Sequence, residues 1–239
     1  MSVLLLKLAA PLQSWGVASR FARRDTQQYP SKSGVLGLIA AAQGRRRTDP
    51  IEEQLVGLGF GVRIEQPGRL IRDFQVAISL DGHKQYPLSQ RYYLSDAVFL
   101  AAIEGDLNLL CGIREALARP AFPLYLGRRS CPVTDRLVLG NIQDRPLPQV
   151  LRDTSWEASL WYRKQQATVV HLPIYRDEYP TDPSEAHDVI PDRVRDIPVS
   201  FDPQRREYGW RTIITDSTRI ENPDGRDTAH NPMAFFGGA

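Results

Sequence analysis

One short pattern in the sequence is typical of an anion-binding site. Ser31, Lys32, Ser33 and Gly34 follow Pro30 where a helix is predicted to begin. Free N–H groups and the positive end of the helix dipole favour an anion there, and a lysine with two hydroxyls strengthens that preference. The alternative is a well-capped helix without a ligand. The pattern is not a P-loop, because the G-x-x-x-x-G-K-[ST] spacing is absent.

A pair of arginines forms a second candidate site. Gly127, Arg128, Arg129 and Ser130 follow a strand predicted over 124–126. Because side chains alternate along a strand, the two arginines cannot both point into a core. At least one therefore faces solvent, a partner or a phosphate, with surface ion pairing as the alternative.

Basic and aromatic side chains interleave between residues 72 and 93. This combination suits stacking on unpaired bases together with phosphate contacts, although aromatic side chains alone more often belong to a core. The residues are Arg72, Phe74, Gln75, His83, Lys84, Tyr86, Arg91, Tyr92 and Tyr93. His83, Lys84 and Tyr86 are also candidates for the base and acid of a metal-independent RNA cleavage, which is the alternative hypothesis.

Other chemistry lacks support in the sequence. The carboxylates form no catalytic pair in a motif, and no nucleophile elbow or dinucleotide fingerprint is present. Two cysteines and four scattered histidines have no zinc-site spacing, so we expect no metal and no cofactor. The cysteines are expected to be reduced thiols of a cytoplasmic protein. No segment has the apolar length of a membrane helix, and we interpret Val3–Leu6 as a strand rather than a targeting segment.

The charged residues are unusual in kind rather than in number. The chain has 239 residues and a net charge of +2, but 26 of its 30 basic side chains are arginine. Arginine suits phosphates and bases, so the bias indicates either a nucleic-acid surface or merely a GC-rich genome. Arg45, Arg46 and Arg47 follow the end of the predicted first helix, where we interpret them as a solvated cluster beside its negative pole.

The predicted elements give an α+β fold. Their order is βαββαβ, as in a ferredoxin-like or RNA-recognition-motif domain, and the turn at 66–68 is predicted to join two strands as a hairpin. The strands are predicted over 3–9, 60–64, 70–80, 91–103 and 124–126, the helices over 31–44 and 106–119, with a long loop over 11–29 and a short helix near 52–58.

The chain changes character after about residue 140. Six prolines between 173 and 203 argue against a central strand there. We expect residues 1–140 to form the main domain, 141–221 a small β-rich and proline-rich subdomain, and 222–239 a flexible tail.

Four segments in order resemble the CasD family, the type I-E CRISPR Cascade subunits that hold the 5′ handle of the guide RNA. They are Ala10–Gly16, Tyr29–Leu38, Arg91–Ala97 and Pro123–Pro132. Segments 176–178 and 195–198, with Trp210, fit the family's C-terminal part more loosely.

The resemblance implies a non-catalytic RNA-binding subunit with a protruding β-hairpin thumb at about 72–93. It implies one copy per complex, bound to the crRNA 5′ handle, a CasC-type backbone subunit and a CasA-type large subunit. A related type I-C subunit cleaves RNA with tyrosine, lysine and histidine, which keeps the nuclease alternative open. The expected RNA contacts are Gln13, Trp15, Arg20, Arg23, Arg24, Ser31, Lys32, Ser33, Gly34, Phe74, Gln75, His83, Lys84, Arg91, Tyr92, Arg128 and Arg129.

Overall fold

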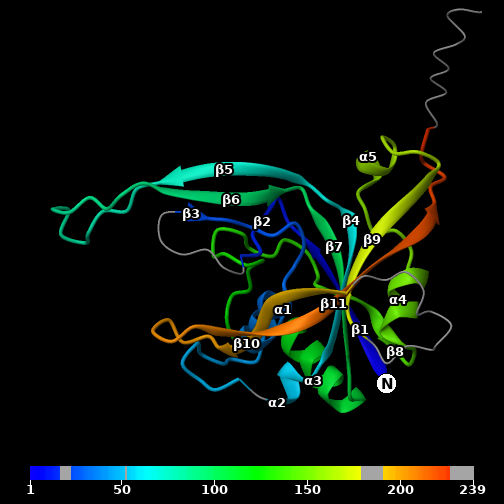
Figure 1. The fold of residues 1–239 in the computed structure, drawn as a ribbon, viewed down its shortest axis with the longest axis horizontal. Helices are drawn as coiled ribbons and strands as arrows, with labels where there is room; N and C mark the ends of the chain where they lie inside the picture. Colours follow the sequence, from blue (N-terminus) through cyan, green and yellow to red (C-terminus); the bar gives the residue numbers. More distant parts are fainter. Residues whose placement is uncertain (17–22, 52, 179–190, 227–239) are drawn as a thin grey trace, which may run out of the picture.

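The computed structural model describes residues 1–16, 23–51, 53–178 and 191–226, which form a mixed α/β structure made mostly of strands (Figure 1). The strands are β1 (Ser2–Ala9), β2 (Leu12–Gln13), β3 (Arg23–Arg24), β4 (Gly59–Gln66), β5 (Arg69–Gln75), β6 (Ser89–Ser95), β7 (Val98–Gly105), β8 (Val138–Gln143), β9 (Val169–Asp177), β10 (Pro191–Ser200) and β11 (Glu207–Glu221). The helices are α1 (Lys32–Ala42), α2 (Glu53–Val56), α3 (Leu107–Ala118), α4 (Leu147–Asp153) and α5 (Leu160–Arg163).

Seven strands form the main sheet, in the order β10-β11-β9-β4-β7-β1-β8. Strand β1 pairs antiparallel with β7 along its whole length and with β8 on its other side. The predicted strand over 3–9 and both long predicted helices are confirmed. Ser31 caps α1 and Asp106 caps α3, each through a side-chain oxygen that accepts backbone N–H bonds.

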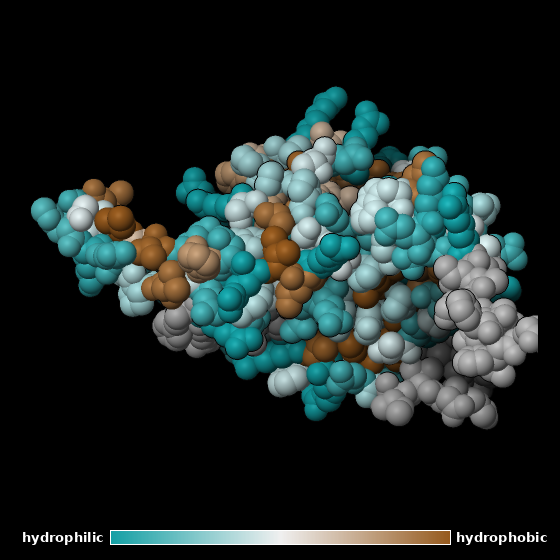
Figure 2. Space-filling view, turned by 90° about the horizontal axis from the view of Figure 1, so that it is seen from above, coloured by the Kyte–Doolittle hydropathy of each residue, from teal (hydrophilic) through white to brown (hydrophobic). Residues whose placement is uncertain are grey.

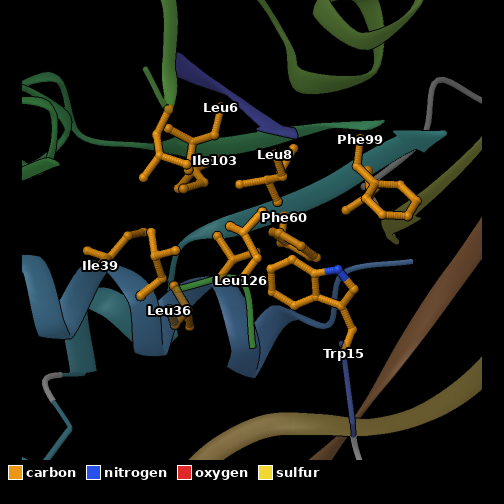
Figure 3. Close-up of a cluster of buried hydrophobic side chains, with 14 of the residues drawn as sticks. Leu6, Leu8, Trp15, Leu36, Ile39, Phe60, Phe99, Ile103 and Leu126 are labelled. Atoms are coloured by element: carbon orange, nitrogen blue, oxygen red, sulfur yellow. The ribbon is translucent and has the colours of Figure 1, made fainter. Parts of the chain in front are cut away.

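Hydrophobic side chains fill both faces of this sheet. Helices α1 and α3 pack on one face, where Trp15, Leu36, Phe60 and Leu126 meet in the larger core cluster (Figure 3). Helix α4 covers the other face through Leu147, Val150 and Leu151, which pack on Val3, Leu5 and Leu100. The centre of the sheet, at β1, β4 and β7, is therefore buried on both faces, whereas its outer strands β8, β10 and β11 are largely exposed or half-buried.

The hairpin predicted across the turn at 66–68 is wrong. Strand β5 does not pair with β4; it pairs with β6 in a second sheet of order β2-β6-β3 with β5 alongside β6. The strand predicted over 91–103 is accordingly two strands, β6 and β7, separated at Asp96, whose φ is 55°. Strand β4 is buried and β5 is exposed, so the chain must leave the main sheet between them.

The new pair, β5 and β6, forms the thumb. Its strands pair from Arg69 opposite Ser95 to Gln75 opposite Ser89, and the hairpin protrudes far from the rest of the molecule (Figure 1). Residues 76–88 connect the strands at the tip, and Gly82 adopts a φ of 75° in the predicted turn there. The observed strands extend the predicted thumb by a few residues at its base.

The strand predicted over 124–126 is also wrong. Only an isolated bridge joins Tyr125 to Pro132, and β8 takes the edge of the sheet instead. Leu126 is buried and its N–H donates to the carbonyl oxygen of Cys131, which folds this segment into a tight loop. The two arginines of the Gly-Arg-Arg motif therefore lie in a turn rather than on a strand. The long loop predicted over 11–29 contains the two short strands β2 and β3.

The last three strands extend the same sheet. Strand β9 pairs with β4 over only three residues, Ile174 to Arg176, and with β11 along its full length. The expectation that prolines bar a central strand is therefore wrong, because Pro173 lies just outside the β4 pairing and loses no bond to it. The division near residue 140 stays a prediction, and the sheet continues across it.

The tail predicted from residue 222 begins in contact with the fold. Asn222 is buried, and its side-chain amide donates to the carbonyl oxygens of Arg163 and Ala167. Residues 227–239 lie outside the described ranges. Across those ranges, no helix combines the length and hydrophobicity that crossing a membrane requires.

Candidate RNA interface

Arginine and tyrosine side chains gather where the thumb leaves the molecule, and we call Arg23, Arg24, Arg91 and Tyr92 the thumb base. Strand β6 places Arg91 opposite Asp73 of β5 on one side and Arg24 of β3 on the other. The guanidinium of Arg23 lies over the ring of Tyr92, 5.3 Å from its centre. Arg23 and Arg24 are both exposed. The second sheet thus brings together residues that are far apart in the sequence.

Arg91 has an unusual environment within this group. Its Nε atom is buried and has no hydrogen-bond partner among the residues that the structure describes. A buried donor without a partner costs free energy, and such groups in native proteins are often completed by a ligand or a water molecule. An acceptor such as a phosphate oxygen would satisfy this donor once the surrounding groups move to expose it.

The Gly-Arg-Arg turn lies against the thumb base, and its two arginines, Arg128 and Arg129, have different environments. Arg128 donates to the carbonyl oxygens of Tyr92 and Arg24 at 3.1 and 2.7 Å and stacks over Tyr93. Half-buried Arg128 therefore holds the turn to β3 and β6, whereas Arg129 is exposed and makes contacts available to a partner. Gly127 is required at this turn, because its φ is 88° and a Cβ atom would lie 1.7 Å from the carbonyl oxygen of Ser14.

The predicted anion site at the start of α1, Ser31–Gly34, already holds a carboxylate of the protein. The N–H of Lys32 donates to Oδ2 of Asp196 at 2.8 Å, and the Lys32 ammonium lies 3.0 Å from Asp177. Arg211 bridges these two carboxylates, and all four side chains are largely buried. Burial opposes the charge of Arg211, but its hydrogen bonds to Asp196 and Asp177 raise its pKa above the usual value. An internal anion thus occupies the position that the sequence predicts for a phosphate.

Two other predicted RNA contacts are interior residues. Gln13 is fully buried and donates its amide to the carbonyl oxygens of Leu8 and Ala97. Trp15 is 1% exposed, and its indole N–H donates to Gln13 Oε1 at 3.1 Å. The prediction that they contact RNA needs correction, because their polar atoms are turned into the protein. The motif that contains Gln13 and Trp15 therefore holds the backbone in place through internal hydrogen bonds and does not offer these two side chains to a ligand.

The remaining predicted contacts lie along the thumb. Phe74 is 66% exposed on β5, and Gln75 is exposed beside it. His83, Lys84 and Tyr86 are exposed near the tip, where the Lys84 ammonium lies over the Tyr86 ring. The tip thus brings the three alternative catalytic residues into one turn, far along the hairpin from the thumb base (Figure 1). Arg20 lies outside the described residues.

The structure adds a cleft that sequence reasoning missed, and we call it the arginine cleft. It has a volume of about 750 Å³ and lies between α1, the loop at 122–132 and the tip of the β10–β11 hairpin. No Asp or Glu of the described chain lines the cleft. Five arginines do: Arg45, Arg46, Arg47, Arg129 and Arg206. The run of three at the end of α1 is a signal in the sequence, although we interpret it there as a solvated cluster. Arg206 has no such signal near it.

The fold agrees with comparisons with known proteins. The family model described as CRISPR-associated protein (Cas_Cas5) matches residues 3–214. The chain belongs to this family, and the predicted resemblance to CasD is confirmed.

Relatives of known identity cover most of the chain. The CRISPR system Cascade subunit CasD of Escherichia coli (strain K12) is 31% identical over 190 residues, which cover 72% of this chain and 85% of the relative. A chain of a CRISPR RNA-guided surveillance complex superposes with a TM-score of 0.70 at 30% identity, covering 96% of this chain and 95% of that one. A crystal structure of a Cas protein gives a TM-score of 0.60 at 30% identity, covering 94% and 98%.

Proposed function

We propose that this protein is a non-catalytic subunit of a type I-E Cascade complex that binds the 5′ handle of crRNA. The observation that carries the proposal is the thumb base, where exposed Arg23 and Arg24 lie beside the strand of Arg91 and Tyr92, and Arg91 Nε has no partner among the described residues. Single-stranded RNA is bound by this combination, in which arginines neutralise phosphates and rings stack on unpaired bases. The complex would act in the cytoplasm, in antiviral defence.

We further propose that the RNA-binding part has a ferredoxin-like core. Strands β8, β1, β7 and β4 are neighbours in that order and antiparallel, which supports this topology. Helices α1 and α3 follow β1 and β7 and pack on one face, as the βαββαβ order requires.

The handle phosphates would lie against Arg23, Arg24, Arg91 and Arg129. Handle bases would stack on Tyr92 and Phe74, and the polar thumb residues Gln75, His83 and Lys84 would make outer contacts. The helix start is left out of this path because Asp196 already satisfies it. Arg128 contributes by holding the turn that presents Arg129.

The partners proposed are a CasC-type backbone subunit and a CasA-type large subunit, with one copy of this chain bridging them. The thumb supports a protein partner as well as RNA, because large apolar side chains alternate with polar ones along it (Figure 2). Leu70, Phe74, Ile78 and Leu80 are all exposed, by 62% or more. Exposed apolar surface of this kind marks an interaction site.

Arg91→Ala tests the RNA role. We expect it to weaken retention of guide RNA by the purified complex, with a loss of about 1.5–3 kcal/mol for a charge-assisted hydrogen bond. The measurement is the RNA that co-purifies with the complex at moderate salt, quantified and sequenced. Arg69→Ala, an exposed arginine at the outer strand of the same hairpin, is the matched control. Unchanged retention in the Arg91 variant would overturn the role of the thumb base.

The alternative function is a metal-independent endoribonuclease that cuts CRISPR repeat RNA. The grouping of His83, Lys84 and Tyr86 at the tip favours it enough to be tested. The full chain is incubated with repeat RNA in EDTA. Stoichiometric binding without cleavage supports the non-catalytic proposal, whereas specific cleavage that His83→Ala abolishes would replace it.

A further inference from the structure

We propose that the arginine cleft binds one or two unpaired nucleotides of RNA, with the phosphates on its arginines and the bases against its aromatic side chains. This inference rests on the proposed RNA-binding function and adds a site to it. The thumb base and the cleft would be separate contacts on one RNA strand, connected by Arg129.

The shape of the cleft follows from the small residues of α1. Gly37, Ala40 and Ala41 line it beside Leu38, so this face of the helix is formed mostly by small side chains that leave the space open. The loop at 122–132 forms a second wall and the β10–β11 tip a third. The hairpin reaches this position because Asp196 of β10 and Arg211 of β11 are tied to the start of α1 and to Asp177. The volume of about 750 Å³ suits a small number of nucleotides and lies within the range of ligand sites.

The charge of the cleft points to a polyanion. Arg46, Arg47, Arg129 and Arg206 line the cleft with no Asp or Glu among the described lining residues, so an anion that joins these guanidiniums gains stability. Arg47 donates to the hydroxyl of Tyr125 at 3.1 Å. Burial raises the pKa of Tyr208, while the nearby charges of Arg206 and Arg47 oppose that rise. Arg206 comes from the hairpin and Arg47 from the end of α1, so two walls of the cleft direct positive charge to one place.

The aromatic side chains of the cleft favour nucleotides over other polyanions, because a base can stack on them. Phe122, Tyr125, Phe201 and Tyr208 line the same cleft as the arginines. Phe122 is 41% exposed, so its ring is open to stacking. A forked guanidinium beside a planar ring matches a phosphate beside a base, and each stacked base adds to affinity. An acidic peptide would use the charges but leave the rings without planar partners.

Continuity with the thumb base supports one RNA path. Arg129 lines the cleft, and the adjacent Arg128 donates to Tyr92 and Arg24 of the thumb base. Ser130 lies 3.3 Å from the hydroxyl of Tyr93 on β6. An RNA strand that leaves the thumb base therefore reaches the arginine cleft across the Gly-Arg-Arg turn, whose adjacent residues Arg128 and Arg129 contact the two sites.

The test is the affinity of the full-length chain for a fluorescent oligouridylate of about eight nucleotides, a length typical of single-stranded sites. The double variant Arg46→Gln with Arg206→Gln removes two exposed charges from different walls. We expect its Kd to rise at least about tenfold, as for the loss of charge-assisted bonds. The slope of log K against log salt should fall by about 0.7 for each phosphate that the variant no longer neutralises. Arg136→Gln with Arg219→Gln, two exposed arginines outside the cleft, is the matched control and should bind as the wild type.

A second measurement identifies the binding surface directly. Oligouridylate that carries 4-thiouridine is photocrosslinked to the chain, and the crosslinked peptides are identified by mass spectrometry. Crosslinks to residues 122–129 or 201–208 support the cleft. Crosslinks confined to the thumb, together with unchanged affinity of the double variant, overturn it.

Failure of this inference is distinct from failure of the proposed function. If the wild type binds RNA and Arg91→Ala weakens it while the cleft variant does not, only the cleft site is overturned. If the wild type binds no RNA, the proposed function fails and the cleft inference with it. Oligoglutamate serves as a competitor; if it displaces the RNA at similar concentrations, the cleft is an acidic-peptide site and the nucleotide inference is overturned.

Discussion

The two ends of helix α1 carry positive charge, but the protein uses them differently. At the start, the backbone N–H of Lys32 donates to Asp196 and its ammonium pairs with Asp177, and this group is buried. At the other end, Arg46 and Arg47 are exposed and line an open cleft to which the described chain contributes no carboxylate. The start is the better anion site by local chemistry, and it is the one that the protein fills itself.

The difference shows that a local motif such as Ser31–Gly34 predicts a preference for anions but does not show which anion binds, whether an RNA phosphate or a carboxylate of the protein. The N–H group of Lys32 and the carboxylate of Asp196 are 164 positions apart in the sequence. Because the hairpin carries Asp196 to the helix start, its tip is also brought to the helix end, where it adds Arg206 to the cleft. One anchored hairpin therefore closes the first site and builds the second.

Removing the internal anion should have the largest effect on this arrangement. Asp196→Ala leaves Arg211 and the Lys32 N–H without their shared acceptor in a buried site. Breaking a buried pair costs about 3–5 kcal/mol, and because Arg211 keeps its bond to Asp177 we expect a loss at the lower end of that range. Urea unfolding followed by tryptophan fluorescence measures the loss.

The control for that variant lies on the same strand. Asp192 is exposed, and its carboxylate accepts the N–H of the next residue, Arg193. Asp192→Ala should therefore change stability by less than about 0.5 kcal/mol, as is usual for a surface position. If Asp196→Ala is as stable as Asp192→Ala, the hairpin is held by other interactions, and the contrast between the two helix ends loses its cause.

Two glycines on α1 provide the next contrast. A Cβ atom at Gly34 would lie 2.9 Å from the buried ring of Trp15, whereas one at Gly37 would lie 3.4 Å from Phe201, which is half-buried. We expect Gly34→Ala to cost about 1–3 kcal/mol through overpacking. Gly37→Ala should be neutral or stabilising by up to about 1 kcal/mol, because alanine favours the helix. Thermal unfolding of both variants under one condition measures the difference; equal losses would contradict it.

The local features of this molecule are easier to predict from the sequence than its long-range pairings. The apolar period and the cap at Ser31 are enough for α1, because both signals lie within one segment. The partner of β5 cannot be predicted in this way. The turn residues at 66–68 indicate that the chain changes direction, but they do not show whether the next strand stays in the same sheet or joins another one. The arginine cleft is hidden in the sequence because its walls come from three distant segments, and nothing near Arg206 indicates that it meets Arg47.

The smallest effect concerns the cap at the closed end of the helix. The hydroxyl of Ser31 accepts the N–H of Gly34 at 3.2 Å, whereas the Ser33 hydroxyl lies 3.4 Å from that of Ser31. Ser31→Ala should therefore cost about 1 kcal/mol, as for loss of an N-cap, and Ser33→Ala should cost less. Urea unfolding gives the ranking. RNA affinity should be equal in the two variants, because Asp196 rather than a phosphate occupies this end. A drop in RNA affinity for the Ser33 variant, with its stability preserved, would show that the helix start contacts RNA after all.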